Sequence, residues 1–277
     1  MLDSSVSYAN AGAPAWPRAV NGSAPAGRDA RAFDAGLRRL RAAIAQRLFV
    51  LHFQPIVSVR DRRVRHHEAL LRLADSPDGS LTAPGRFLPA AERFGLIEEI
   101  DRMVIDRVIA LLGEDRLGRI AVNVSALSVT DPTLLAHIEG GLQLHRVEPS
   151  RLLVEITETA AIADMARARE FCIGVLTLGC GLALDDFGAG FGSLHYLRHL
   201  PFSHLKIDGE FIRRLPSSPL DQLLVGAIVG VARGVGAKTV AEFVGDEQTI
   251  ELLAQLGVDY AQGFAVGRPQ PLAPAVA

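Results

Sequence analysis

The sequence predicts an α/β barrel that opens with an antiparallel pair of strands. Three observations support this fold: about eight short apolar runs, helical segments between the later runs, and no Pro-rich or Gly-Ser linker dividing them. An open doubly wound sheet is the alternative, but no glycine fingerprint of the dinucleotide-binding type follows any of the runs. The barrel is therefore the favoured fold.

The composition is that of an ordinary globular protein. Of the 277 residues, 49% are apolar and 22% are charged. The net charge of −2 gives no reason to expect a DNA-binding or membrane-binding surface. No apolar run is long enough to insert into a membrane, and Cys172 and Cys180 have no paired spacing, so we expect small core residues rather than a disulfide or zinc site. A reducing, cytoplasmic setting fits these features.

The chain begins with a segment that carries no periodic pattern. Residues 1–30 are rich in Ala, Gly, Pro and Ser and are expected to form a disordered tail, with one barrel domain over 31–277. Apolar residues at helical spacing predict a helix over 33–44. The β-rich runs 48–59 and 64–73 follow, separated by a charged turn, and predict the antiparallel pair.

After two further helices the sequence alternates between strand and helix. Helices are expected at 84–94, 98–112, 132–144, 165–178, 220–234 and 247–256, with a short one ending at 200. Strands are expected at 120–125, 152–158, 182–186, 204–208, 238–242 and 258–263. Such alternation is typical of parallel strands joined by helical crossovers.

Two adjacent aspartates end the strand that includes Leu182–Leu184. Asp185 and Asp186 precede a loop with three glycines within five residues. Two carboxylates this close repel each other, and a protein usually keeps them together because a cation lies between them. The alternative is that Asp186 only caps the following helix.

Polar side chains stand at or near the ends of most of the apolar runs, including the run that ends in the two aspartates. They are Asn123, Glu155, Asp185, Asp186, Lys206, Glu242 and Gln262. In a parallel barrel these ends gather on one face, where barrel enzymes build their active sites. Any single residue could be a helix cap or a satisfied buried group, but the whole set favours a functional site.

The residue types indicate metal-assisted chemistry. Oxygen ligands from Glu68, Asn123, Glu155 and Asp185 suit Mg²⁺ or Mn²⁺ and disfavour Zn²⁺. Asp185 with Asp186 could hold a second ion about 3.5–4 Å away, the two-metal spacing of phosphoesterases. 

Positive charge and a proton acceptor complete this prediction. Lys206 and Arg72 would lie near a phosphate, and Glu242 could take a proton from water or hold the second metal. His66 and His67 precede Glu68, but neighbouring strand residues point to opposite faces, so we do not expect a histidine metal site.

In this order the motifs resemble those of the EAL-domain family of cyclic di-GMP phosphodiesterases. They are Gln54-Pro55-Ile56, Glu68-Ala69-Leu70-Leu71-Arg72, Asn123-Val124-Ser125, Glu155-Ile156-Thr157-Glu158, Asp185-Asp186-Phe187-Gly188-Ala189-Gly190, Lys206-Ile207-Asp208, Ala241-Glu242 and Gln262-Gly263. The resemblance covers about residues 37–271. It implies a modified TIM (β/α)8 barrel with the first strand antiparallel, and hydrolysis of cyclic di-GMP to linear pGpG by a metal-activated water.

The resemblance also implies roles for individual residues. Glu68, Asn123, Glu155 and Asp185 would bind one Mg²⁺ or Mn²⁺, and Asp185, Asp186 and Glu242 the second. Lys206 would hold a water on the metal or a phosphate oxygen. Gln54 and Arg72 would contact the dinucleotide, Gln262 would support the water site, and Glu158 would hold the loop after Asp186. A homodimer is implied through the helix and loop after Asp186, with Phe187, Phe191 and Leu194 as candidates; the alternative is that these residues pack against the barrel.

Three departures from the family pattern affect the expected activity. Gly245 stands where the family often has a second acid, and Ala189 and Gly192 remove two hydroxyls from the loop after Asp186. None replaces a predicted metal ligand, so we expect an active enzyme, with activity lower or more dependent on dimerisation. A receptor that binds cyclic di-GMP without cutting it is the main alternative, and a protein-interaction module is the third.

Overall fold

A computed structural model describes residues 28–75, 79–157, 164–188 and 199–273. The chain divides into two compact units. The first holds residues up to Val50 together with Arg72–Leu96, and the second holds Leu51–Leu71 and Ile97–Ala277. Each unit is described by itself below.

The first unit contains two helices. Helix α1 spans Arg28–Ala45, starting earlier than predicted, and α2 spans Pro84–Arg93 with a proline in its first turn. The ring of Phe87 lies 5.6 Å from that of Phe49. The predicted disorder of residues before Arg28 lies outside the described residues.

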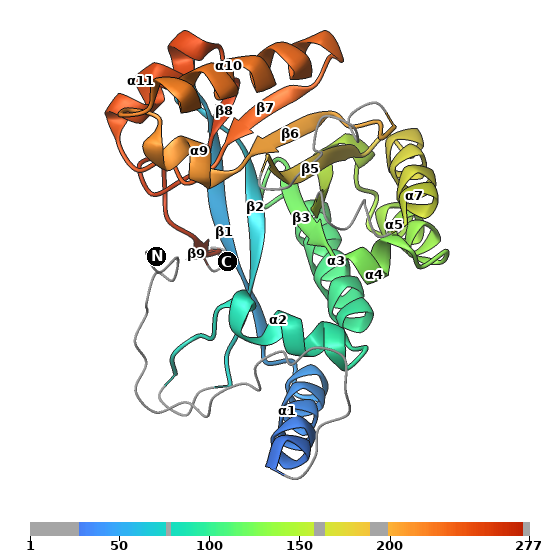
Figure 1. Cartoon of the computed structure of the whole chain (residues 1–277). Helices are drawn as coiled ribbons and strands as arrows, with labels where there is room; N and C mark the ends of the chain where they lie inside the picture. Colours follow the sequence, from blue (N-terminus) through green and yellow to red (C-terminus); the bar gives the residue numbers. More distant parts are fainter. Residues whose placement is uncertain (1–27, 76–78, 158–163, 189–198, 274–277) are drawn as a thin grey trace. The chain divides into compact units, whose positions relative to one another are not determined.

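The second unit is built on a closed ring of eight strands that pair in sequence order, and most of them are labelled in Figure 1. They are β1 (Phe49–Ser58), β2 (Val64–Leu73), β3 (Ile120–Val124), β4 (Leu152–Thr157), β5 (Gly181–Phe187), β6 (His204–Ile207), β7 (Lys238–Ala241) and β8 (Tyr260–Ala261). Strands β2 to β8 pair in parallel, and β1 closes the ring because it pairs with β2 and runs antiparallel to β8. The barrel with an antiparallel first strand is confirmed; β9 (Gln270–Pro271), paired with β1, was not predicted.

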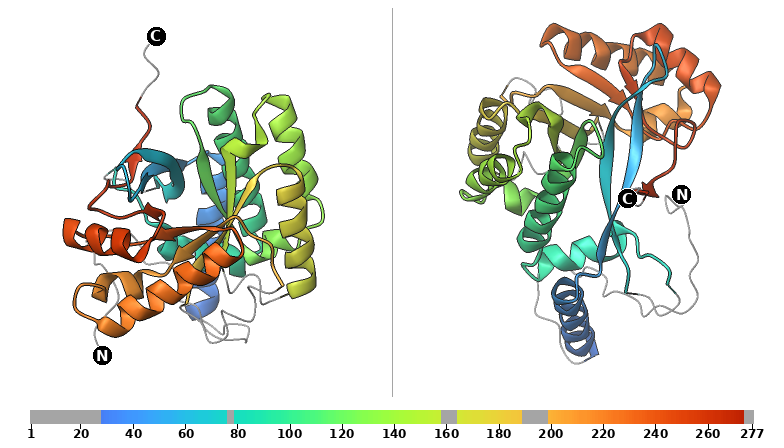
Figure 2. Two further views of the ribbon diagram at one scale, coloured as in Figure 1. Left: turned by 90° about the horizontal axis from the view of Figure 1, so that it is seen from above. Right: turned by 180° about the vertical axis from the view of Figure 1, so that it is seen from behind.

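Helices lie outside the strands of this unit (Figure 2). They are α3 (Ile97–Gly113), α5 (Leu134–Leu144), α7 (Met165–Thr177), α10 (Pro219–Gly234) and α11 (Glu247–Leu256), all close to their predicted bounds. Three short helical segments were not predicted: α4 (Ala126–Val129), η1 (Pro149–Arg151) and α9 (Gly209–Arg214). The predicted short helix ending at Leu200 falls on residues outside the described part. Among the described helices, none has the length and apolarity that a membrane span requires.

The alternation of side chains along each strand organises the barrel interior. Residues two apart on a strand share a face, so the residue two positions before a site residue also points into the barrel. Near mid-barrel, Ala121, Leu153 and Ala183 form a buried apolar cluster. Two positions further along these strands stand Asn123, Glu155 and Asp185, at the carboxyl ends. The alternation thus places these polar residues next to the apolar cluster, on the side nearer the carboxyl ends of the strands.

Candidate active site

Asp185 and Asp186 stand next to each other in the middle of a bulge. The register between β5 and β6 shifts between Leu184 and Phe187, and Asp186 has a left-handed backbone with φ of 55°. We expected the strand to finish at the two aspartates, but β5 continues to Phe187. The bulge inserts one residue and so lets both carboxylates reach the same space.

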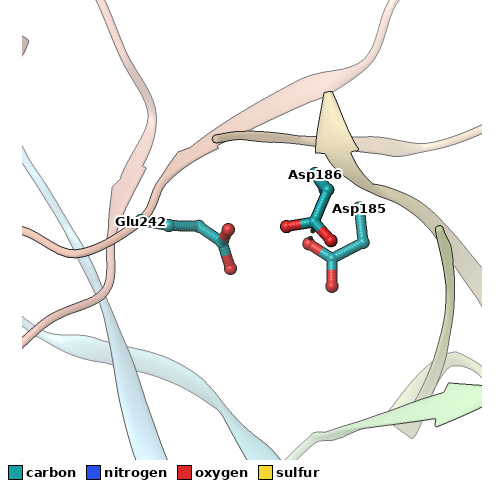
Figure 3. Close-up of side chains that lie close together, drawn as sticks. All are labelled: Asp185, Asp186 and Glu242. Atoms are coloured by element: carbon teal, nitrogen blue, oxygen red, sulfur yellow. Dashed lines mark hydrogen bonds between the residues drawn. The ribbon is translucent and has the colours of Figure 1, made fainter. Parts of the chain in front are cut away.

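Glu242 joins the two aspartates from the next-but-one strand. It directly follows β7, and its carboxylate faces those of Asp185 and Asp186 in Figure 3. One oxygen from each of the three acids lies within 4.8 Å of the others. Asp185 and Glu242 are each 8% exposed, whereas Asp186 is exposed at the surface. Three carboxylates gathered this closely form a candidate site for a divalent cation.

Lys206 lies at the centre of the acidic cluster. Its Nζ lies 2.9 Å from Glu242 Oε1 and 3.0 Å from both Glu155 Oε2 and Asp185 Oδ1. Glu68 Oε2 is a fourth neighbour at 3.6 Å. Lys206 is only 1% exposed, so its ammonium group is enclosed by the barrel and contacts these carboxylates instead of solvent. One positive charge faces four carboxylates, so the cluster keeps a surplus of negative charge.

Burial and this surplus set the pKa values of the acids. Burial raises the pKa of Glu242 to about 8, with Asp185 and Glu68 adding to the rise against the opposing effect of Lys206. Asp186 is exposed on one side only, and partial desolvation on its other side, then the neighbouring Asp185, raises its pKa to about 6. Burial also holds the pKa of Glu155 well above its usual value. The acids of the cluster therefore resist ionising together.

Lys206 and Glu68 stay charged despite their burial. Burial acts to lower the pKa of Lys206, but the surrounding carboxylates, Asp185 first, raise it well above its usual value. Burial acts to raise the pKa of Glu68, but Lys206, Gln262 and Asn123 together outweigh it and lower the pKa. Within the cluster, Lys206 therefore remains protonated and Glu68 remains ionised.

Three amide side chains and Glu68 form a hydrogen-bonded chain that reaches from the acids to the first and last strands. Asn123 Nδ2 donates to Glu68 Oε1 at 2.6 Å, and Gln262 Nε2 donates to the other Glu68 oxygen. The same Gln262 nitrogen lies 3.2 Å from Gln54 Oε1, and Gln54 Nε2 donates to the Gly267 carbonyl at 3.0 Å. Barrel closure brings Gln54 and Gln262 together across the length of the chain.

Two buried oxygens of the cluster have no hydrogen-bond partner among the described residues. They are Glu155 Oε1 and Gln262 Oε1. A buried acceptor without a donor costs free energy, and a bound cation satisfies such an oxygen as well as a donor does. The orphaned oxygens, all carboxylate or amide, therefore fit a site for Mg²⁺ or Mn²⁺.

Several predicted residues lie away from this cluster or beyond the described part of the chain. Arg72 belongs to the first unit, so its contact with a substrate stays a prediction. Glu158, Phe191 and Leu194 fall outside the described residues. Phe187 is 3% exposed, which agrees with the alternative that it packs against the barrel.

A second polar layer, which was not predicted from the sequence, lies at the level of the apolar cluster, where His204 pairs with Ala183. His66, His204 and Tyr260 stand two residues before Glu68, Lys206 and Gln262, and their rings lie 5.9–6.2 Å apart. Burial lowers the pKa of His66 to about 3 and that of His204 to about 4. The spacing of two from the predicted site residues was the available signal. His66 is buried on the Glu68 face, as the alternation requires.

Two exposed aromatic rings near the carboxyl ends were missed as well. Phe243 and Phe264 are 56% and 53% exposed, and each ring is covered by an arginine, Arg213 or Arg268, about 4 Å from the ring centroid. Each phenylalanine follows a predicted site residue by one or two positions. Only adjacency to Glu242 and Gln262 could have indicated them from the sequence.

The comparisons with known proteins agree with this geometry. The sequence matches the EAL domain over residues 37–269. The cyclic di-GMP phosphodiesterase PdeB of Shewanella oneidensis is 39% identical over 241 residues, which are 85% of this chain and 28% of PdeB. The bifunctional diguanylate cyclase/cyclic di-GMP phosphodiesterase MucR of Pseudomonas aeruginosa is 40% identical over 240 residues, 85% of this chain and 35% of MucR.

A solved structure is similar over almost its whole length. The PaMucR phosphodiesterase in its c-di-GMP complex superposes with a TM-score of 0.79 at 39% identity, covering 86% of this chain and 98% of that one. The chain spans about a third of the length of PdeB and MucR. With the matched residues covering the barrel and the acidic cluster, this chain belongs to the EAL domain family.

Proposed function

We propose that the chain is a metal-dependent phosphodiesterase that hydrolyses cyclic di-GMP to linear pGpG. The observation that carries this proposal is the approach of Asp185, Asp186 and Glu242 to within 4.8 Å of one another beside the buried Lys206. The names of the relatives supply the substrate, because PdeB is named a cyclic di-GMP phosphodiesterase and PaMucR was solved with c-di-GMP.

The residues divide into two sets of metal ligands. Glu68, Asn123, Glu155 and Asp185 would hold one ion, and Asp185, Asp186 and Glu242 the other. We propose Mg²⁺ or Mn²⁺ because every donor is a carboxylate or amide oxygen. When bound, such ions lower the pKa of a coordinated water and stabilise charge on a phosphoryl oxygen.

The chain's own residues would then handle the proton and the phosphate charge. Glu242 would either accept the proton of the attacking water or complete the second metal site, and its carboxylate lies beside both Asp185 and Lys206. Lys206, which stays protonated, would hold the Glu242 carboxylate in position and offset the negative charge that develops on the phosphate.

The substrate would be bound by amides and an arginine. Gln54 and Gln262, hydrogen bonded to each other and both nearly buried, are rigid enough to orient a nucleotide beside the acids. Arg72 would contact a phosphate, and Glu158 would support the loop after Asp186. The family pattern is the basis for the substrate contacts of Gln54, Gln262 and Arg72. It is also the basis for the supporting role of Glu158.

A homodimer is a further part of the proposal; the family pattern implies it through the helix and loop after Asp186, and α10 offers a second apolar surface for it. The outward face of α10 is apolar over its whole length, with Leu220, Leu223, Leu224, Ala227 and Val231 all exposed. Ala227 and Gly230 at its middle are small, so a second copy of the helix could approach closely along a two-fold axis. We also place the reaction in the cytoplasm, which suits the two free, buried cysteines.

Turnover of cyclic di-GMP with Mg²⁺ or Mn²⁺ tests the proposed function. Wild type and Glu242→Ala are compared by chromatography of the nucleotides. Formation of pGpG by the wild type alone supports a metal hydrolase. If neither protein cuts the nucleotide but both bind it in Ca²⁺, the receptor alternative replaces the enzyme. If neither binds, the interaction-module alternative remains.

A further inference from the structure

Phe243 is displayed at the surface by a backbone conformation that phenylalanine rarely adopts. Its φ is 53°, in the left-handed region that favours glycine, and its side chain is 56% exposed. Its neighbours on both sides point inward, since Glu242 is 8% exposed and Val244 is fully buried. A large apolar ring in a strained, exposed position next to an active-site acid indicates a functional constraint.

The loop that carries Phe243 is fixed by backbone hydrogen bonds. The Val244 N–H donates to the Gln262 carbonyl at 2.9 Å, and the Ala265 N–H donates to the Val244 carbonyl at 3.1 Å. The loop is therefore tied to the segment that carries Gln262, another site residue. The left-handed turn is part of a rigid arrangement, and the ring cannot withdraw into the core by a local shift of the chain.

The ring itself is held between two groups from α9. The Arg213 guanidinium lies 4.1 Å from the ring centroid, the geometry of a cation–π contact. At Gly209 a Cβ atom would come within 2.2 Å of the ring, so only glycine there makes room for it. Both residues follow β6, the strand that supplies Lys206. The Arg213 guanidinium thus lies over the ring of Phe243, and the ring stays partly exposed at the carboxyl ends of β6 and β7.

We propose that the Phe243–Arg213 pair is a stacking platform for one guanine base of the cyclic dinucleotide. This inference rests on the proposed function, which supplies the ligand. Purine bases stack on aromatic rings and on guanidinium planes. Phe243 directly follows Glu242 in the chain, and the Arg213 guanidinium lies over its ring. The positive charge of Arg213 also favours a ligand that carries two phosphates. Phe243 then contributes to substrate specificity, and Arg213 is a positioning residue that holds the ring.

Binding in Ca²⁺ by the intact chain, with three replacements at Phe243, tests the platform. Phe243→Trp keeps an aromatic ring, Phe243→Leu keeps an apolar side chain in the strained backbone, and Phe243→Gly removes both the ring and the strain. We expect Phe243→Leu and Phe243→Gly to weaken cyclic di-GMP binding about tenfold or more, and Phe243→Trp to retain it. Phe243→Gly should melt no lower than wild type, because glycine adopts this φ freely. A loss of affinity without a loss of stability separates stacking from a packing role.

A fluorescent base gives a direct readout of stacking. A cyclic dinucleotide carrying 2-aminopurine should be quenched on binding the wild type and should stay bright on Phe243→Leu at saturating protein. Arg213→Met should weaken binding, whereas the neighbouring Arg214→Met should not, because Arg214 pairs instead with Asp221.

The outcomes distinguish this inference from the proposed function. If the wild type binds cyclic di-GMP and Phe243→Gly binds it equally tightly, the platform is wrong and the proposed function stands. If the wild type itself fails to bind cyclic di-GMP, the proposed function fails and the platform fails with it.

Discussion

The Lys206 ammonium lies 2.9 Å from Glu242 Oε1 at the centre of the acidic cluster. The lysine is 1% exposed and also reaches Glu68, Glu155 and Asp185. Removing one charge from a buried ionic group leaves its partners uncompensated, which is costly. Lys206 is therefore expected to stabilise the barrel as well as to serve the reaction.

Replacing Lys206 by methionine should destabilise the fold by about 3–5 kcal/mol at pH 7.5. The acids left behind would have raised pKa values, so the folded state would bind more protons than the unfolded state and the loss should shrink as the pH falls. Urea unfolding at pH 7.5 and pH 5 measures both effects. Lys238→Met is the control, because Lys238 is 55% exposed in its pairing with Asp259 and should change stability by no more than about 1 kcal/mol. Equal losses for the two lysines would contradict the central role of Lys206.

Asp186 combines a left-handed backbone with a proposed metal-binding carboxylate, and two substitutions separate the two roles. Asparagine tolerates this conformation, so Asp186→Asn should fold like wild type but lose about 100-fold or more of its metal-dependent turnover. Asp186→Ala should lose turnover and also about 1–2 kcal/mol of stability. Turnover assays and thermal melts decide the matter. Full activity in Asp186→Asn would remove this residue from the metal site.

Gly245 tests whether the missing second acid limits activity. Nothing lies within 4 Å of a Cβ atom built there, and the residue is exposed, so Gly245→Glu should change stability by no more than about 0.5 kcal/mol. We expect turnover to rise or the Mg²⁺ requirement to fall. Gly118→Glu is a matched control, since Gly118 is equally open but precedes β3 at the opposite end of the barrel. An unchanged rate in Gly245→Glu would show that the departure from the family pattern is harmless. If the wild type is inert and Gly245→Glu is active, the expectation of an active wild-type enzyme is wrong.

The buried His66 should make stability depend on pH. Its pKa is lowered to about 3 by burial, whereas an unfolded histidine titrates near 6.5, so between these values the unfolded state binds more protons. Stability should therefore fall as the pH drops below about 6.5, by up to about 1.4 kcal/mol per pH unit from this residue. His66→Phe removes this term, and because Nε2 of His66 has no hydrogen-bond partner among the described residues, the variant should lose little at pH 7.5.

Urea unfolding from pH 7.5 to pH 4.5 measures the dependence. The His66→Phe curve should be flatter than that of wild type, while His145→Phe, at an exposed position, should leave the curve as it is. Parallel curves for wild type and His66→Phe would mean that His66 does not set the acid sensitivity.

The apolar face of α10 predicts a dimer that a single charge introduced on this face should dissociate. Leu223 is 70% exposed, so Leu223→Glu should change the stability of the monomer by about 0.5 kcal/mol or less. A glutamate at a two-fold interface would face its own copy or an apolar surface and disrupt it. Sedimentation velocity should show a dimer for wild type and a monomer for Leu223→Glu, with Gln248→Glu on α11 as control. A monomeric wild type would exclude the interface.

Most elements of the barrel could be predicted because their signals are local. Apolar runs and helical spacing located β2 and α11 at their observed bounds. The polar residues near the ends of β3 and β4 and directly after β7 marked the face of the site. The short helix α9 was missed because six residues provide too little periodicity to distinguish a helix from a turn. Strand β9 was missed because a two-residue strand is defined by its partner rather than by its own sequence.

The sequence by itself determined which residues stand at the strand ends, because side chains alternate along a strand whatever lies beside it. Only the tertiary structure decided how those residues meet. The bulge between Leu184 and Phe187 depends on the pairing of β5 with β6, and the contact of Gln54 with Gln262 depends on closure of a ring between residues 208 positions apart. The central place of Lys206 likewise arises only when strands from the whole barrel converge. Such contacts are set by register and closure, where a shift of one residue would turn every side chain to the opposite face.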